Sequence, residues 1–158
     1  MSTRSRVGLL RDDGTVKSIY VHFDGYKEGV GKTLQKHYTK VEDIEKLLEL
    51  GNLSVLGSEY NETLSKISWH RYDKDLSDED KKLIEQVDSG SYTITYKDRS
   101  GQNEEARIDE SLAEFVSKAG NCGEEYMYIF KPDYDGVRKW FMMEVPYFEP
   151  LEWLLEGK

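Results

Sequence analysis

The sequence is poor in cysteine, proline and long apolar runs. Its single cysteine, Cys122, excludes an internal disulfide framework and a zinc site built from several cysteines. Three prolines and 13 glycines in 158 residues are too few for a collagen-like or low-complexity chain. No apolar stretch approaches the roughly 18 residues that cross a membrane, and no basic-then-apolar leader opens the sequence. We therefore expect a protein of the reducing cytoplasm that makes no membrane contact.

Basic residues are also scarce, with 22 lysines and arginines against 31 acids and a net charge of −9. The first 40 residues hold eight basic residues and four acids, a net charge of +4, which leaves −13 for the remainder. Direct nucleic-acid binding is disfavoured, because phosphate contacts need clustered positive charge. The acidic remainder is either a solvated surface or a face that docks on a basic partner.

Three strand pairs are predicted from alternating patterns separated by turn residues. The first has the strongest signal, because Asp13-Gly14 supplies the positive φ angle that a tight hairpin needs. In its second strand Val16, Ser18, Tyr20 and His22 share one face. The expected pairs are residues 5–10 with 15–23, 91–98 with 104–108, and 126–131 with 139–145.

Helices are predicted between these strands. They are expected over residues 28–38, 41–50, 77–87 and 111–119. Thr39 and Glu42 match a capping box before the second of them. A further strand is predicted over residues 66–72, and the apolar segment 151–156 is expected to dock. The fold class is therefore α+β: a single domain over residues 1–158, with antiparallel hairpins in a mixed or antiparallel sheet and several short helices packed on it.

One glycine-rich stretch resembles part of a phosphate-binding loop. Gly31-Lys32-Thr33 follows a predicted strand and opens a predicted helix. The complete motif needs a glycine five residues before Gly31, where Tyr26 stands, and Gly25 is one residue too early. A structural glycine turn is therefore the preferred interpretation, although the helix start still offers N–H groups to an anion.

The histidines and the cysteine allow both a chemical and a structural role. His22, Asp24 and His37 could hold a metal ion that activates water. The spacings of tight metal sites are absent, so structural histidines bonded within the fold are preferred. Cys122 could be a nucleophile, but no base lies near it in the sequence, and an inert loop thiol is the default.

The amino-terminal segment carries a long motif with a turn, a strand and a second glycine turn. The motif reads STRSRVG at residues 2–8, GTVKSIYVHFDGY at 14–26, EGVG at 28–31, and Leu34 with His37-Tyr38. It resembles the opening of a family of uncharacterised small proteins from tailed phages and prophages, and a looser similarity follows at EYMYIF (125–130) and Trp140. The resemblance covers about the first 40 residues closely and implies a phage-type origin, one small domain and a bacterial host cytoplasm. It transfers no activity.

The hairpin and the glycine turn are expected to bring a set of basic and aromatic residues within reach of one another. Together with free helix N–H groups, such residues can hold a nucleotide or another anion. In the alternative interpretation Asp24 caps the helix, the tyrosines pack, and the arginines are only solvated. The ligand-binding candidates are Arg4, Arg6, Tyr20, His22, Asp24, Tyr26, Lys32 and His37.

Three functions follow from these patterns. The preferred one is a non-enzymatic phage accessory protein that binds and inhibits a host or defence component, because no complete catalytic constellation is present. The second is a nucleotide- or anion-binding module that uses the amino-terminal turn and sequesters its ligand. The third is a metal-dependent hydrolase using His22, Asp24 and His37. No cofactor is expected, and the oligomeric state stays open.

Overall fold

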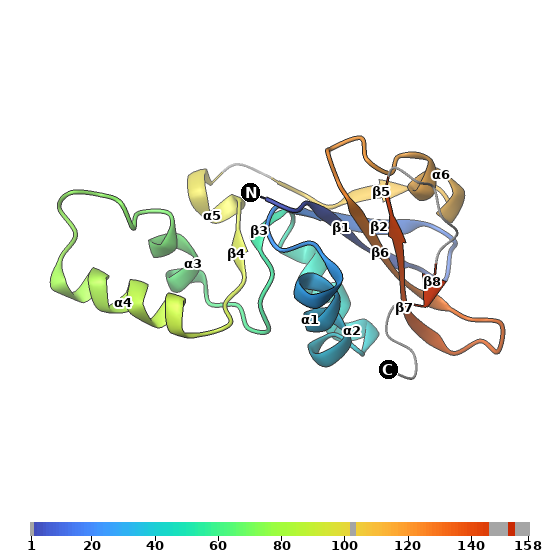
Figure 1. Cartoon of the computed structure of the whole chain (residues 1–158), viewed down its shortest axis with the longest axis horizontal. Coiled ribbons are helices and arrows are strands. Elements are labelled where there is room, and N and C mark those ends of the chain that lie inside the picture. Colours follow the sequence, from blue (N-terminus) through green and yellow to red (C-terminus); the bar gives the residue numbers. More distant parts are fainter. Residues whose placement is uncertain (1, 102–103, 146–151, 154–158) are drawn as a thin grey trace.

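The computed structural model describes residues 2–101, 104–145 and 152–153, and its framework is one mixed β-sheet of eight strands (Figure 1). Seven strands lie in the order β4-β3-β2-β1-β6-β7-β8, and β5 also pairs with β2. The α+β class predicted from the sequence is confirmed. The strands are β1 Ser5–Leu10, β2 Val16–Val21, β3 Leu53–Val55, β4 Ile94–Thr95, β5 Arg107–Asp109, β6 Tyr126–Pro132, β7 Arg138–Glu144 and β8 Glu152–Trp153.

Two antiparallel hairpins form the centre of the sheet. β1 pairs with β2 and β6 pairs with β7, as the sequence predicts. The two hairpins are joined by a parallel pairing of β1 with β6, in which Val7 lies opposite Tyr128. β8 pairs with β7, which agrees with the expected docking of the terminal segment, and the rest of that segment lies outside the described residues.

The outer edge of β2 is shared by two short strands. β3 runs parallel to its end at Val21, and β5 runs antiparallel to its start at residues 16–18. Asn52 bridges the junction: its Oδ1 accepts from the Tyr20 N–H at 2.8 Å, and its own N–H donates to the Glu104 carbonyl at 2.8 Å. This side-chain bridge keeps the edge of β2 hydrogen-bonded where neither neighbouring strand reaches it.

The prediction that residues 91–98 and 104–108 form a hairpin is wrong. β4 pairs with β3, and β5 pairs with β2. A short helix, α5 (Lys97–Ser100), separates them, and the Thr95 hydroxyl accepts from the Asp98 N–H at 3.2 Å at its start. This local hydrogen bond turns the chain away from an extended course, as Thr side chains commonly do.

Most predicted helices are present. The predicted helix over 28–38 begins as a π-helical turn, η1 (Lys27–Gly31), and continues as α1 (Lys32–His37). α2 (Val41–Glu49) buries Ile44, Leu47 and Leu48, and Val41 packs half-buried at its start. The capping box at Thr39 is not formed, because Lys40 occupies the cap position and no side chain bonds there. The Ser77 and Ser111 hydroxyls do cap α4 (Asp78–Ser89) and α6 (Leu112–Ser117).

The strand predicted over residues 66–72 is also wrong. That segment is the end of a helix, α3 (Glu62–Ser68), followed by a turn. The Asn61 side chain accepts from the Leu64 N–H at 3.0 Å and starts this helix. Ile67 and Trp69, which alternate with polar residues in the sequence, therefore lie where a helix ends and not on a strand. Both pack on the small cluster of Leu64, Val87 and Ile94.

The helices cover the sheet unequally. α1 and α2 pack on one face, over a core that includes Ile19, Leu34 and Tyr128. α6 packs on the other face, where Phe115 is fully buried. α3 and α4 project beyond the β4 edge of the sheet (Figure 1). Across the described residues, no helix combines the length and the apolar character that a membrane crossing requires.

Candidate functional site

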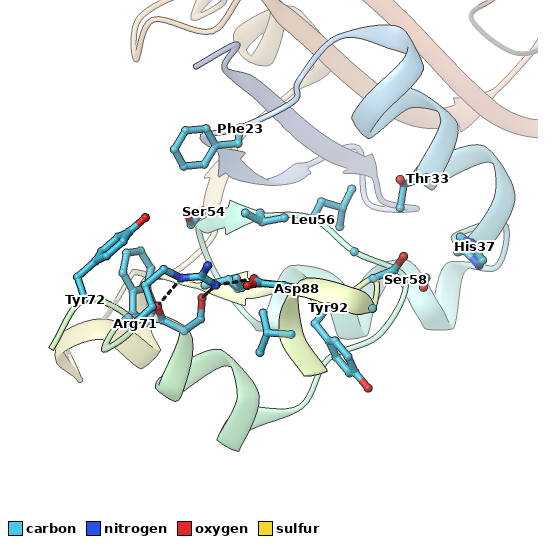
Figure 2. Close-up of a pocket in the computed structure, with 18 residues that line it drawn as sticks. Phe23, Thr33, His37, Ser54, Leu56, Ser58, Arg71, Tyr72, Asp88 and Tyr92 are labelled. Atoms are coloured by element: carbon cyan, nitrogen blue, oxygen red, sulfur yellow. Dashed lines mark hydrogen bonds and ion pairs between the residues drawn. The ribbon is translucent and has the colours of Figure 1, made fainter. Parts of the chain in front are cut away.

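A groove of about 780 Å³ lies between the sheet and the α3–α4 pair (Figure 2). One wall comes from the end of β2, from β3 with the loop after it, and from α1. The opposite wall comes from the turn after α3, the end of α4, and the segment that leads into β4. Its volume lies within the range of about 300–1,000 Å³ that is usual for small-molecule sites.

Aromatic side chains mark the two ends of this groove. Phe23, which is 41% exposed, and Tyr72, which is 91% exposed, come from opposite walls at one end (Figure 2). His37 and Tyr92 lie at the other end. Large exposed rings are costly to hydrate, and they are commonly used to stack on planar ligands. The groove therefore carries aromatic side chains at both of its ends.

An arginine lies between these ends and is held in place by its neighbours. Arg71 Nε donates to the Ser68 carbonyl at 3.3 Å, and Nη2 donates to Ser68 Oγ at 3.2 Å. Nη2 also donates to Asp88 Oδ1 at 3.0 Å, which joins the turn after α3 to α4 (Figure 2). The side chains of Arg71 and Asp88 are 28% and 55% exposed. An exposed pair of this kind stabilises a fold by only about 0–1 kcal/mol, so its main effect is to orient two charged groups at the groove.

A row of rings continues from the groove across the edge of the sheet. The Tyr20 hydroxyl lies 2.8 Å from His22 Nδ1, and the His22 ring meets Phe23 edge-on at 4.6 Å between centroids. The His22 and Tyr96 centroids lie 6.5 Å apart. Burial, assisted by the charge of Arg4, lowers the pKa of His22. The neutral ring is thus favoured, which suits it to stacking.

The row ends at a tryptophan that is covered by a cation. The Trp69 and Tyr96 centroids are 5.5 Å apart, and Trp69 Nε1 donates to the Thr95 carbonyl at 2.9 Å. The Arg99 guanidinium lies 5.3 Å from the Trp69 centroid and 5.1 Å from the Tyr96 centroid. We call Tyr96, Trp69 and Arg99 the platform. Trp69 also lines the groove, so the platform and the groove are continuous.

Arg6, one of the predicted ligand residues, is instead part of a buried ion pair. It is 4% exposed, and its Nε donates to Glu124 Oε2 at 2.8 Å. Its Nη1 donates to Ser18 Oγ at 3.2 Å, and the Cys122 N–H donates to Glu124 Oε1 at 2.9 Å. Burial acts to raise the pKa of Glu124, but Arg6 and the backbone N–H outweigh it and hold that pKa below its usual value. The guanidinium of Arg6 is therefore engaged by Glu124 and Ser18 inside the fold.

The other residues of the predicted site fall into small groups. Arg4 acts on Tyr20 and His22 through its charge, so these three lie together as expected. The Tyr26 hydroxyl donates to Asp24 Oδ1 at 3.3 Å, and the charge of Asp24 is the main cause that raises the pKa of Tyr26.

The glycine turn packs tightly and does not form a phosphate-binding loop. A Cβ atom on Gly29 would collide with the carbonyl oxygen of Asp24, which accepts from the Val30 N–H at 2.8 Å. Asp24 itself has a φ of 58°. Lys32 is exposed and forms no ion pair within the described part of the chain. Gly29 is thus required by a close backbone approach, in agreement with the structural interpretation.

The predicted metal ligands do not form a cluster. Among residues 2–101 and 104–145, no three His, Cys, Asp or Glu side chains are placed to share a metal ion. His22 Nδ1 is engaged by Tyr20, and His37 lies at the far end of the groove. Cys122 is exposed, with its Sγ 3.8 Å from Arg6 Nη2.

Sequence reasoning missed the residues that form the groove wall and the platform. The sequence pattern predicts that Trp69, Arg71 and Tyr72 lie on a strand, and that Tyr96 and Arg99 lie in a hairpin. One signal was present: Asn61 stands three residues before Leu64 and is followed by Glu62, a pattern typical of a helix start. That helix would have placed Trp69 and Arg71 at its end.

Comparison of the chain with family models, curated proteins and solved structures found no match. The site must therefore be interpreted from its own geometry.

Proposed function

We propose that this chain is a non-enzymatic, phage-type accessory protein that binds a nucleotide in the groove between its sheet and the α3–α4 pair. The observation that carries the proposal is a fixed arginine between exposed rings: Arg71 is oriented by Ser68 and Asp88, near Phe23 and Tyr72. In the cytoplasm of an infected cell, sequestering such a ligand would modulate a host or defence component that depends on it.

The base and the phosphate of a nucleotide each have a counterpart in this groove. A base is planar and apolar on its faces, which suits it to the ring edges and faces of Phe23 and Tyr72. A phosphate is anionic and forms its strongest hydrogen bonds with guanidinium groups, which suits it to Arg71. The Asp88 carboxylate can accept a hydrogen bond from an amino group of a base.

The first prediction concerns Arg71. Replacing it with alanine should weaken nucleotide binding about 10-fold or more, because a hydrogen bond to a charged group contributes about 1.5–3 kcal/mol. The fold should be retained, since the Arg71–Asp88 pair is exposed. Isothermal titration with the four ribonucleoside monophosphates measures the affinity. A thermal shift at 100 times the dissociation constant should correspond to about 2.7 kcal/mol of added stability.

The matched control is Arg138→Ala. Arg138 also pairs with an exposed aspartate, Asp12, but it lies on β7 and does not line the groove. This variant should bind nucleotides as the unmodified protein does. Absence of binding by any nucleotide, or equal affinities for the Arg71→Ala and Arg138→Ala variants, would contradict the proposal.

A second candidate function is the inhibition of a basic host or defence protein. It is favoured by the first turn of α4, where Asp78, Glu79 and Asp80 follow one another and form no ion pair with any described residue. Unpaired exposed acids of this kind steer the association of a basic partner.

The prediction for this candidate is a strong dependence on salt. Association of a captured basic partner should slow about 10-fold between low and high salt, since screening shortens the range of exposed charges. Asp78→Asn combined with Glu79→Gln should slow association at low salt, measured by biolayer interferometry. Glu110→Gln, at an exposed position after β5, is the control. A partner whose association is indifferent to salt would argue against docking through α4.

A further inference from the structure

The groove and the platform have one residue in common. Trp69 lines the groove and also stands 5.5 Å from Tyr96 in the platform. Phe23 lines the groove and meets His22, which in turn lies 6.5 Å from Tyr96. Trp69 and Tyr96 are inclined to each other by only 35°, so together they present a ring surface beside the groove, and His22 meets Phe23 and Tyr96 edge-on.

Positive charge gathers at this surface although the whole chain is acidic. The Arg99 guanidinium lies over Trp69 and Tyr96. Arg4 acts on Tyr96 as well as on His22. In the part of the chain that the structure describes, neither Arg99 nor Arg4 forms an ion pair with a carboxylate.

A surface that combines cations with aromatic rings can bind both the phosphates and the bases of a nucleotide. Sequence-tolerant binding of single-stranded nucleic acid uses this combination, with bases on aromatic rings and phosphates near Arg and Lys. A guanidinium plane over a ring can itself stack on a base. The platform therefore offers a second base site beside the first.

We propose that the ligand is a dinucleotide, with one base in the groove between Phe23 and Tyr72 and the second on the platform of Tyr96, Trp69 and Arg99. This inference rests on the proposed nucleotide-binding function and adds the number of nucleotides. A longer strand is disfavoured because the net charge of −9 repels a continued phosphate backbone.

The test compares mononucleotides with dinucleotides of the same base. Isothermal titration uses the four ribonucleoside monophosphates and the four linear 5′-phosphorylated homodinucleotides. For at least one base, the dinucleotide should bind about 10-fold or more tightly than its mononucleotide, because a second stacked base is added.

Arg99→Ala isolates the platform. Arg99 is exposed and makes ring contacts, so the substitution should leave the fold intact and weaken dinucleotide binding much more than mononucleotide binding, which removes most of the dinucleotide advantage. Arg138→Ala, whose side chain lies at neither place, should keep that advantage. Thermal unfolding of both variants verifies that they are folded.

The outcomes separate the two proposals. If mononucleotides bind but the dinucleotides bind equally well, the second base site is refuted and the nucleotide-binding function stands. If Arg99→Ala weakens both ligand types equally, the platform belongs to a single site and the two-base arrangement is refuted. If no mononucleotide and no dinucleotide binds, the proposed function falls, and this inference falls with it.

Discussion

Replacing Arg6 with methionine is expected to lower the free energy of unfolding by about 3–5 kcal/mol, because the Glu124 carboxylate is left buried without its partner. The side chains of Arg6 and Glu124 are 5% and 0% exposed, and they join β1 to the segment that precedes β6. Urea denaturation followed by circular dichroism measures the change. Nucleotide affinity, measured under conditions in which the variant is folded, should stay within about 2-fold of the unmodified protein.

The companion double variant, Arg6→Met with Glu124→Leu, should recover much of the lost stability, since it removes both buried charges. An Arg6→Met variant that is as stable as the unmodified protein but no longer binds nucleotides would instead restore Arg6 to the ligand site that the sequence suggested.

The same pair determines a pH dependence. Because the pKa of Glu124 is depressed in the folded state, its contribution to stability is fully present above the ordinary glutamate pKa. That contribution is lost as the pH falls through the depressed pKa. The Arg6→Met variant should lack this part of the acid-induced loss.

Gly29→Ala is expected to destabilise the protein by about 1–3 kcal/mol or more, because the new Cβ atom has no space against the Asp24 carbonyl. Relief of the collision would pull Val30 away from the same carbonyl and weaken its 2.8 Å hydrogen bond. Thermal and urea unfolding measure the loss.

Lys32→Ala provides the contrast within the same motif. It should change the stability by less than about 0.5 kcal/mol, since Lys32 is an exposed residue without an ion-pair partner among the described residues. Its nucleotide affinity should also be unchanged. A phosphate-binding loop would give the opposite pattern, with ligand binding lost on removal of the lysine.

Local signals made part of the fold predictable. Asp13-Gly14 lies between two alternating segments, and the β1–β2 hairpin follows from that arrangement. α2 has an apolar stripe with helical spacing, and Ser77 precedes three acids where a helix starts. Each of these elements is determined by residues close together in the sequence, so a single sequence contains enough information to predict it.

The rest of the sheet depends on contacts between distant segments. The parallel pairing of Val7 with Tyr128 and the division of β2 between β3 and β5 leave no local pattern. The same holds for the candidate site, where Trp69 and Tyr96 meet only because α3 packs beside β4. The predicted contact of Tyr20 with His22 is present, by contrast, because Tyr20 lies on β2 and His22 directly follows it with the same alternation.

The pairing of β3 with β4 allows the segment between these two strands to change in evolution while the sheet stays the same. Val55 lies opposite Ile94, so the chain leaves and re-enters the sheet at neighbouring positions. Between them, α3 and α4 pack around the small cluster of Leu64, Val87 and Ile94, which lies at this edge of the sheet. One whole wall of the groove is thus an excursion that can be shortened, lengthened or exchanged without altering the central hairpins. Related chains can therefore keep the same sheet and acquire new ligands by replacing this one segment.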